Sequence, residues 1–114
     1  MKSVVYELNL ELGYPTVDEA LRRLENFVGV SRKMKRPVLK IIHGYGSSGK
    51  GGRIRTASRK WLQEHLSAGD CIIRGEDFSI FDETTRNAFL RCAALRCDYD
   101  LEQCNRGVTF VIFN

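Results

Sequence analysis

Apolar side chains divide the first part of the chain into three elements. Residues 4–10 alternate between apolar and polar, which predicts a half-buried strand. After a Gly-Tyr-Pro break, apolar residues recur at helical spacing as far as about Lys35, and a Thr-Val-Asp-Glu capping box at 16–19 marks the start of this helix. Residues 38–42 are almost wholly apolar, which predicts a strand buried on both faces, as in a parallel sheet.

Strands and helices continue to alternate in the rest of the chain. The expected elements are a helix from Arg53 to about Leu66, a short strand at 71–74, a helix at 82–95 capped by Asp82, and a closing strand at 107–113. This order, β-α-β-α-β-(extra α)-β, predicts one α/β domain over residues 1–114. No run of 18 apolar residues occurs and the alternating start is unlike a signal peptide, so a cytoplasmic protein is expected.

The net charge of +4 conceals an uneven distribution. Residues 31–60 hold ten of the 18 basic side chains and no Asp or Glu, so all 14 acidic residues lie elsewhere. Such asymmetry predicts a positive face for a polyanion, although cations at the end of the first helix also suit its dipole. The ten are Arg32, Lys33, Lys35, Arg36, Lys40, Lys50, Arg53, Arg55, Arg59 and Lys60.

A loop rich in glycine and cations joins the second strand to the second helix. Glycines allow positive φ and close backbone approach, and a helix N-terminus offers free N–H groups to an anion. Arginine can bind phosphate through two hydrogen bonds. The loop is therefore expected to bind phosphate, with nucleic acid as its source. The candidate contacts are His43, Gly44, Tyr45, Gly46, Ser47, Ser48, Gly49, Lys50, Arg53 and Arg55.

Two other chemistries are disfavoured. A near match to the nucleotide-binding P-loop has Gly51 where a hydroxyl residue would hold magnesium, which argues against ATP or GTP hydrolysis. Cys71 falls in a predicted strand, and the cluster of Cys92, Cys97 and Cys104 has no neighbouring histidine, which argues against a zinc site. Buried, reduced thiols are expected at these positions, ahead of a metal site or a redox pair.

His43 has two interpretations. It stands at the carboxyl end of a predicted parallel strand, where α/β proteins place ligands. Its imidazole suits general acid–base chemistry on a phosphodiester near neutral pH. Alternatively, the ring hydrogen-bonds the loop and fixes its shape. The sequence leaves both interpretations open.

Three segments resemble one known family. Residues 41–46, followed by Ser48-Gly49 and Ile54-Arg55, are similar to the H-G-x-G…G…L-R signature of Smr (small MutS-related) domains. Residues 16–21 and 107–111 look like the start of that family's first helix and its closing strand. The resemblance implies a two-layer α/β sandwich of helices on a mixed, mainly parallel sheet, like the C-terminal domain of translation initiation factor 3. It also implies binding of DNA or RNA and, in many members, endonuclease activity.

The chain departs from this family's pattern in two places. Active Smr domains carry an L-D-x-H motif after the first strand, and the matching residues here are Leu10-Glu11-Leu12-Gly13. Glu11 replaces the aspartate, and Gly13, which has no side chain to transfer a proton or bind metal, replaces the histidine. The segment at about 78–106 is longer than the usual connection and is expected to add a helix that covers a sheet face or binds a partner.

The leading hypothesis is a nucleic-acid-binding Smr-like domain in which cleavage is weak or lost. Lys50, Arg53 and Arg55 would contact phosphates, and Tyr45 would either stack on a base or pack the loop. The cations Lys33, Lys35 and Arg36 would help if they share that face.

Two alternatives belong to other functional classes. One is an active endonuclease that uses His43 and Glu11, and only this alternative requires a divalent metal; otherwise no cofactor is expected. The other is a protein-interaction module in which the inserted helix binds a protein partner. No membrane partner is expected.

Overall fold

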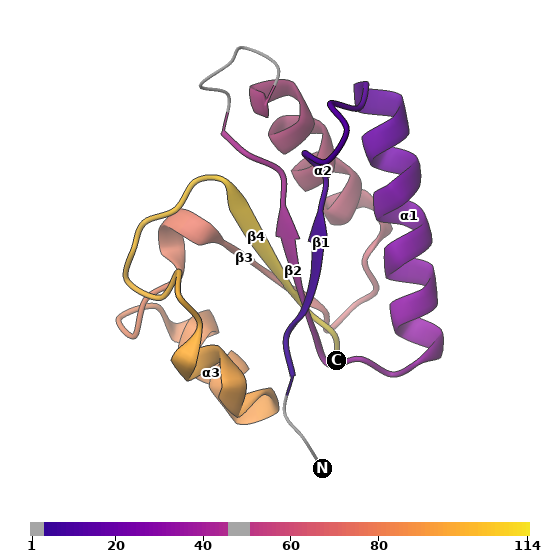
Figure 1. Cartoon of the computed structure of the whole chain (residues 1–114). Helices are drawn as coiled ribbons and strands as arrows, with labels where there is room; N and C mark the ends of the chain where they lie inside the picture. The colour runs from indigo at the N-terminus through magenta and orange to yellow at the C-terminus, as the bar shows by residue number, and fades with distance from the viewer. Residues whose placement is uncertain (1–3, 46–50) are drawn as a thin grey trace.

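A four-stranded sheet forms the centre of the protein (Figure 1). The computed structural model describes residues 4–45 and 51–114. The strands lie in the order β1-β2-β4-β3, where β1 is Tyr6–Asn9, β2 is Val38–Ile42, β3 is Cys71–Arg74 and β4 is Val108–Ile112. The predicted bounds of β2 and β3 are confirmed, whereas β1 and β4 are each shorter than the predicted strand.

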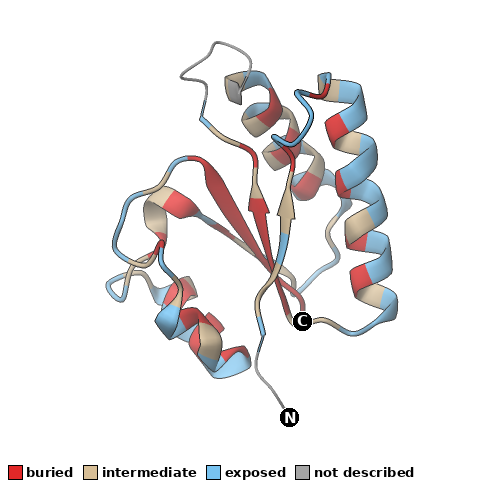
Figure 2. Cartoon of the chain, in the orientation of Figure 1, coloured by how far each residue is buried: buried red, intermediate tan, exposed pale blue. Residues whose placement is uncertain are grey.

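Strand directions explain why the sheet is mixed. β1 pairs with β2 in parallel, but β4 runs antiparallel to both of its neighbours, β2 and β3. Three strands therefore point one way, as a mainly parallel sheet requires, although only one of the three pairings is parallel. β4 is buried at every position along its length (Figure 2), because it is a central strand covered on both faces.

Two helices cover one face of the sheet. α1 (Val17–Lys33) and α2 (Gly51–His65) pack on it through an apolar core that includes Leu24, Leu39 and Leu62. The hydroxyl of Thr16 accepts a hydrogen bond from the Glu19 N–H, which confirms the predicted N-cap. α1 ends at Lys33 rather than Lys35, because Met34 leaves helical geometry and Lys35 adopts a positive φ of 55°.

The inserted segment covers the other face as a third layer. It includes the helix α3 (Glu83–Arg91) and the 3-10 turn η2 (Ala93–Cys97). The 3-10 turn η1 (Gly75–Asp77) precedes it, and together they pack against β3 and β4. Asp82 caps α3, as predicted. The prediction that this helix continues to Leu95 is wrong, because Cys92 adopts an extended conformation that ends the α-helix.

Lys40 joins the sheet to the inserted segment. Its side chain is buried, and Nζ lies 2.9 Å from Asp98 Oδ1 and 2.6 Å from Asp100 Oδ2. Burial alone would lower the pKa of Lys40, but the hydrogen bonds and charges of Asp100 and Asp98 together raise it. Lys40 therefore forms an internal ion pair and contributes no charge to the surface. The interpretation of residues 31–60 as one basic face is wrong for this residue.

The cysteines are not the buried set that was predicted. Only Cys92 is buried, whereas Cys71, Cys97 and Cys104 are exposed. The edge position of β3 leaves Cys71 at the surface, and the turns of the inserted segment do the same for the other two. Within residues 4–45 and 51–114, no helix is both long and apolar enough to cross a membrane.

Candidate functional site

The carboxyl ends of β1, β2 and β3 meet at one edge of the sheet, at the top in Figure 1. Glu11 follows β1, His43 and Gly44 follow β2, and Glu76 follows β3. The first turns of α2 and the residues just before β4 complete this edge. Residues 46–50, which hold five of the predicted phosphate contacts, lie outside the described residues.

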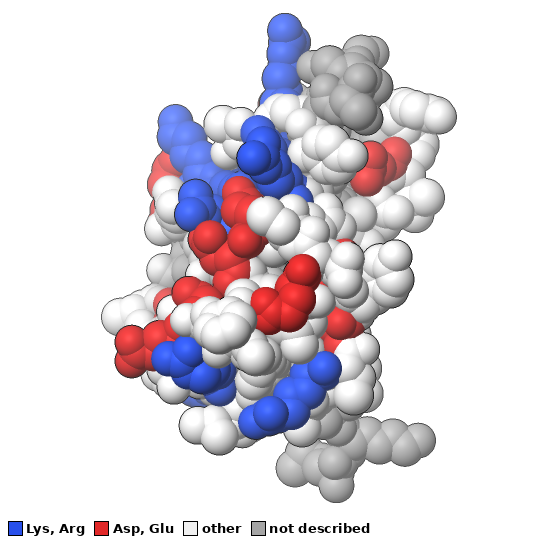
Figure 3. All heavy atoms as spheres, turned by 90° about the vertical axis from the view of Figure 1, so that its left-hand side faces the viewer, with Lys and Arg blue, Asp and Glu red and all other residues white. Residues whose placement is uncertain are grey.

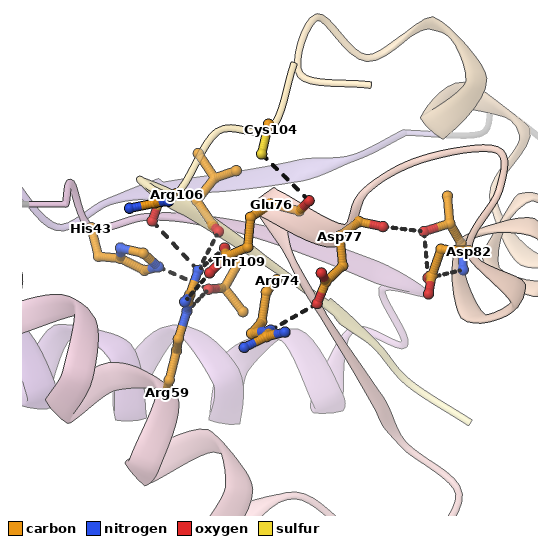
Figure 4. A network of polar contacts seen from close by, with 11 residues as sticks. His43, Arg59, Arg74, Glu76, Asp77, Asp82, Cys104, Arg106 and Thr109 are labelled. Carbon is orange, nitrogen blue, oxygen red and sulfur yellow. Dashed lines mark hydrogen bonds and ion pairs between the residues drawn. The ribbon is translucent and has the colours of Figure 1, made fainter. Parts of the chain in front are cut away.

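His43 is buried inside this edge with both ring nitrogens hydrogen-bonded. Nδ1 lies 2.7 Å from the Gly44 carbonyl, and Nε2 lies 2.8 Å from Thr109 Oγ1. A carbonyl only accepts, so Nδ1 carries the proton and Nε2 accepts from the hydroxyl. Thr109 Oγ1 in turn accepts from Arg59 Nε at 2.9 Å. A chain of donors therefore runs from Arg59 through Thr109 to His43 (Figure 4), and His43 donates in turn to the backbone carbonyl of Gly44.

This environment keeps His43 uncharged at neutral pH. Burial lowers the pKa of the imidazole to about 4; the hydrogen bond to the Gly44 carbonyl opposes the shift, and the charges of Arg59 and Arg55 add to it. The geometry matches the interpretation in which His43 fixes the loop. In the described residues, no hydrogen bond joins His43 to Glu11.

Because the His43 ring is buried and uncharged, we expect the protein to lose stability in mild acid. Its pKa is about 4 in the fold against an ordinary value of 6.5, so the unfolded state binds the proton first as the pH falls. The free energy of unfolding should fall by about 2 kcal/mol between pH 7 and pH 5, measured by urea denaturation. Most carboxyl groups titrate below pH 5, so they contribute little to a change measured between pH 7 and pH 5.

Two variants serve as controls for this pH effect. His43→Asn should be less stable at pH 7 but show little further loss down to pH 5, because the titrating ring is gone. His65→Gln, which removes the other histidine of the chain, should keep the wild-type pH dependence. A wild-type protein with equal stability at both pH values would contradict the buried, neutral assignment.

Arg59 is the central cation of the site. Its guanidinium forms a two-point ion pair with Glu76, at 2.9 and 2.7 Å, and also donates to the carbonyls of Val108 and Arg106 (Figure 4). Burial alone would raise the pKa of Glu76, but Arg59 lowers it. Arg59 therefore holds α2, η1 and the start of β4 together, and its charge is neutralised.

A cationic groove lies outside Arg59. It has a volume of about 550 Å³, and Arg55, Lys60 and Arg106 line it together with Arg59 and Glu76. Among the described residues, no carboxylate forms an ion pair with Arg55, Lys60 or Arg106. Figure 3 shows Lys and Arg gathered in the upper part of one face, above a band of Asp and Glu. The groove therefore offers three uncompensated positive charges to an anion.

A second pocket of about 490 Å³ adjoins this groove. The two share Cys104 and Arg106, and Tyr45 and Tyr99 line the second pocket. Tyr45 is 57% exposed and Tyr99 is 85% exposed. A Cβ built on Gly107 would lie 3.2 Å from Tyr45 Cδ1, so the glycine leaves room for this ring. The second pocket, with its two tyrosines, is thus continuous with the cationic groove.

The predicted site residues fall into separate groups. Gly44 adopts a positive φ of 74°, and a Cβ there would lie 2.8 Å from Oε2 of Glu11, so Glu11 lies against the loop backbone while remaining exposed. Arg53 is exposed and Arg55 is half-buried on the first turns of α2. Tyr45 lines the second pocket.

The cations at the end of α1 do not share the site. They precede β2, whereas the site follows it, so the length of the strand separates Lys33, Lys35 and Arg36 from the loop. Arg32 pairs with Asp70, and the guanidinium of Arg36 lies 4.5 Å from the centre of the Tyr6 ring. The condition under which these cations would help the loop, a shared face, is therefore not met.

Sequence reasoning missed Glu76, Thr109, Arg106 and Tyr99, and it counted Arg59 only as one cation among ten. The four-residue spacing of Arg55 and Arg59 places both on one face of α2, a signal available from sequence. The other residues come from segments 17 to 50 positions away from Arg59, and no local pattern marks them.

Comparisons with known proteins agree with this architecture. A family model described as the Smr domain matches residues 10–74. The crystal structure of the Smr domain of Thermus thermophilus MutS2 is similar to the chain, with a TM-score of 0.56 and 20% sequence identity, over 96% of this chain and 98% of that chain. At this identity the similarity shows the fold alone. No curated protein matches the sequence.

Proposed function

The chain belongs to the Smr domain family, whose members are generally nucleic-acid-binding or endonuclease-like, and we propose that it binds nucleic acid through the cationic groove beside α2. The observation that carries the proposal is the set of three cations without carboxylate partners, Arg55, Lys60 and Arg106, along one groove. Guanidinium and ammonium groups bind phosphate, and three of them in one groove suit the polyanionic backbone of a nucleic acid. Residues 46–50 of the glycine-rich loop, which lie outside the described residues, are proposed to supply further backbone donors.

We propose that binding occurs without efficient cleavage. His43 is 0% exposed, its ring nitrogens are both hydrogen-bonded, and its low pKa leaves it uncharged. A buried neutral imidazole held in this way is a poor general acid toward a bound phosphodiester. Gly13 offers no side chain for proton transfer, so within residues 10–13 only Glu11 has an ionisable side chain. These features support a role in recognition.

Fluorescence anisotropy with labelled single-stranded and duplex DNA and RNA tests the proposal, with a salt titration for each probe. For single strands, the logarithm of the binding constant should fall against the logarithm of salt concentration with a slope of about −2 or steeper, since about 0.7 counterions leave per phosphate contact. No binding to any probe at low salt would overturn the proposal and favour a protein partner for the inserted segment.

The recovered strands, run on a denaturing gel, test the absence of cleavage. Intact strands after prolonged incubation are expected. Cut strands would favour the endonuclease alternative, and loss of cutting in His43→Ala with binding retained would assign the chemistry to that residue. Intact strands with salt-sensitive binding would support a recognition domain.

A further inference from the structure

The second pocket has the composition of a base-binding site. Two tyrosines line it, one from the loop after β2 and one from the inserted segment, and both rings are largely exposed. Exposed aromatic rings beside a polar wall are suited to stack on a nucleobase, whose faces are apolar and whose edge carries hydrogen-bonding groups. Gln103 also lines the pocket, and its amide can both donate and accept a hydrogen bond.

The position of this pocket relates it to the cationic groove. Arg106 lines both, so a phosphate bound in the groove lies next to the opening of the pocket. Adjacent phosphate and base are covalently linked in one nucleotide, so one strand can occupy both sites. In a duplex, by contrast, the base is paired and stacked and has to leave the helix before it can enter such a pocket.

We propose that Tyr45 and Tyr99 form a pocket for an unpaired base, so that the domain selects single-stranded nucleic acid over duplex. This inference rests on the proposed function, because the phosphate of the same strand is held by the groove. The inserted segment at 78–106 thereby determines specificity as well as covering the sheet, since it supplies Tyr99, Gln103 and Arg106.

The structure also explains how the two rings differ. A Cβ on Gly107 would lie 3.2 Å from Tyr45 Cδ1, so one edge of the Tyr45 ring lies close to the residue just before β4. Tyr99 is 85% exposed and follows Asp98, which is fixed through Lys40. Removal of the Tyr99 ring therefore leaves the fold intact, and this makes Tyr99 the residue of choice for a test.

Anisotropy with three labelled probes of about 12 nucleotides tests the inference: a single strand, its duplex, and a strand of the same length with abasic sites. Each probe is prepared as DNA, and the single strand and the duplex also as RNA. Tyr99→Ala should weaken single-strand binding by about 5- to 150-fold and leave duplex and abasic binding unchanged, because only the stacked base is lost. Tyr99→Phe should restore single-strand binding, since the ring is kept.

A matched control is Phe81→Ala. Phe81 is also an exposed aromatic residue of the inserted segment, 84% exposed, and it does not line either pocket. This variant should bind every probe as the wild type does. Equal losses for all three probes in Tyr99→Ala, or no loss for any, would overturn the base pocket while leaving the proposed function standing. Absence of wild-type binding to all probes would instead refute the proposed function itself.

Discussion

Replacement of Lys60 and Arg106 by glutamine is expected to weaken nucleic-acid binding about 100-fold at physiological salt. Both cations line the groove, and no described carboxylate forms an ion pair with either. A hydrogen bond to a charged group contributes about 1.5–3 kcal/mol, so two lost phosphate contacts correspond to at least two orders of magnitude. The salt dependence should become shallower by about 1.4 units for a single strand. Anisotropy titrations at several salt concentrations measure both effects.

Lys33 and Lys35 provide the matched control for charge. They are exposed like Lys60 and Arg106 but lie at the opposite end of β2. Lys33→Gln/Lys35→Gln removes the same net charge, so any general attraction between a cationic protein and a polyanion changes equally. We expect this variant to keep near-wild-type affinity and salt slope. Equal losses in the two double variants would show that net charge, and not the groove, determines binding.

Lys40→Met is expected to reduce the free energy of unfolding by about 3–5 kcal/mol, measured by urea denaturation at pH 7. Methionine keeps the length of the side chain but leaves Asp98 and Asp100 buried close together without their cation. Two carboxylates held close together without a cation repel each other, and protonation relieves that repulsion. His43 is retained in this variant, so the variant should lose less stability than the wild type as the pH falls from 7 to 5.

Two further variants show whether the loss of stability in Lys40→Met comes from the unpaired carboxylates or from the changed side-chain packing. Lys40→Met/Asp98→Asn/Asp100→Asn removes the unpaired charges and should recover most of the lost stability. Arg74→Met breaks the exposed pair with Asp77 and should cost less than about 1 kcal/mol, because solvent screens that pair. A Lys40→Met protein as stable as Arg74→Met would show that the buried ion pair contributes little to holding the inserted segment.

Local signals in the sequence were sufficient for most element boundaries. Thr16 and Asp82 cap their helices through side-chain hydrogen bonds to residues three positions later, an interaction within one turn. The apolar run at 38–42 reflects burial on both faces, and β2 has these bounds in the structure. In each case the physical cause lies within a few residues of the pattern.

The prediction that the cations of residues 31–60 form one positive face was wrong where a cation pairs with a distant carboxylate. Lys40 and Arg59 belong to a stretch without acidic residues, yet their carboxylate partners lie 58 and 17 positions further along the chain. Composition in a window cannot show that Asp98 or Glu76 returns to neutralise such a cation. The second pocket could not be predicted from sequence for the same reason. Tyr45 and Tyr99 are 54 positions apart, and the fold of the inserted segment places them around one pocket.

The place of β4 in the sheet has a consequence for how the chain acquires its fold. β4 lies between β2 and β3, and its pairing joins Val38 to Ile112 across 74 positions of sequence. Before β4 is in place, β2 can pair with β1 along one edge only and β3 has no partner strand, and such open edges are prone to aggregate. The sheet is complete only after residues 108–112 have paired with both β2 and β3, so its formation depends on contacts between segments far apart in the sequence.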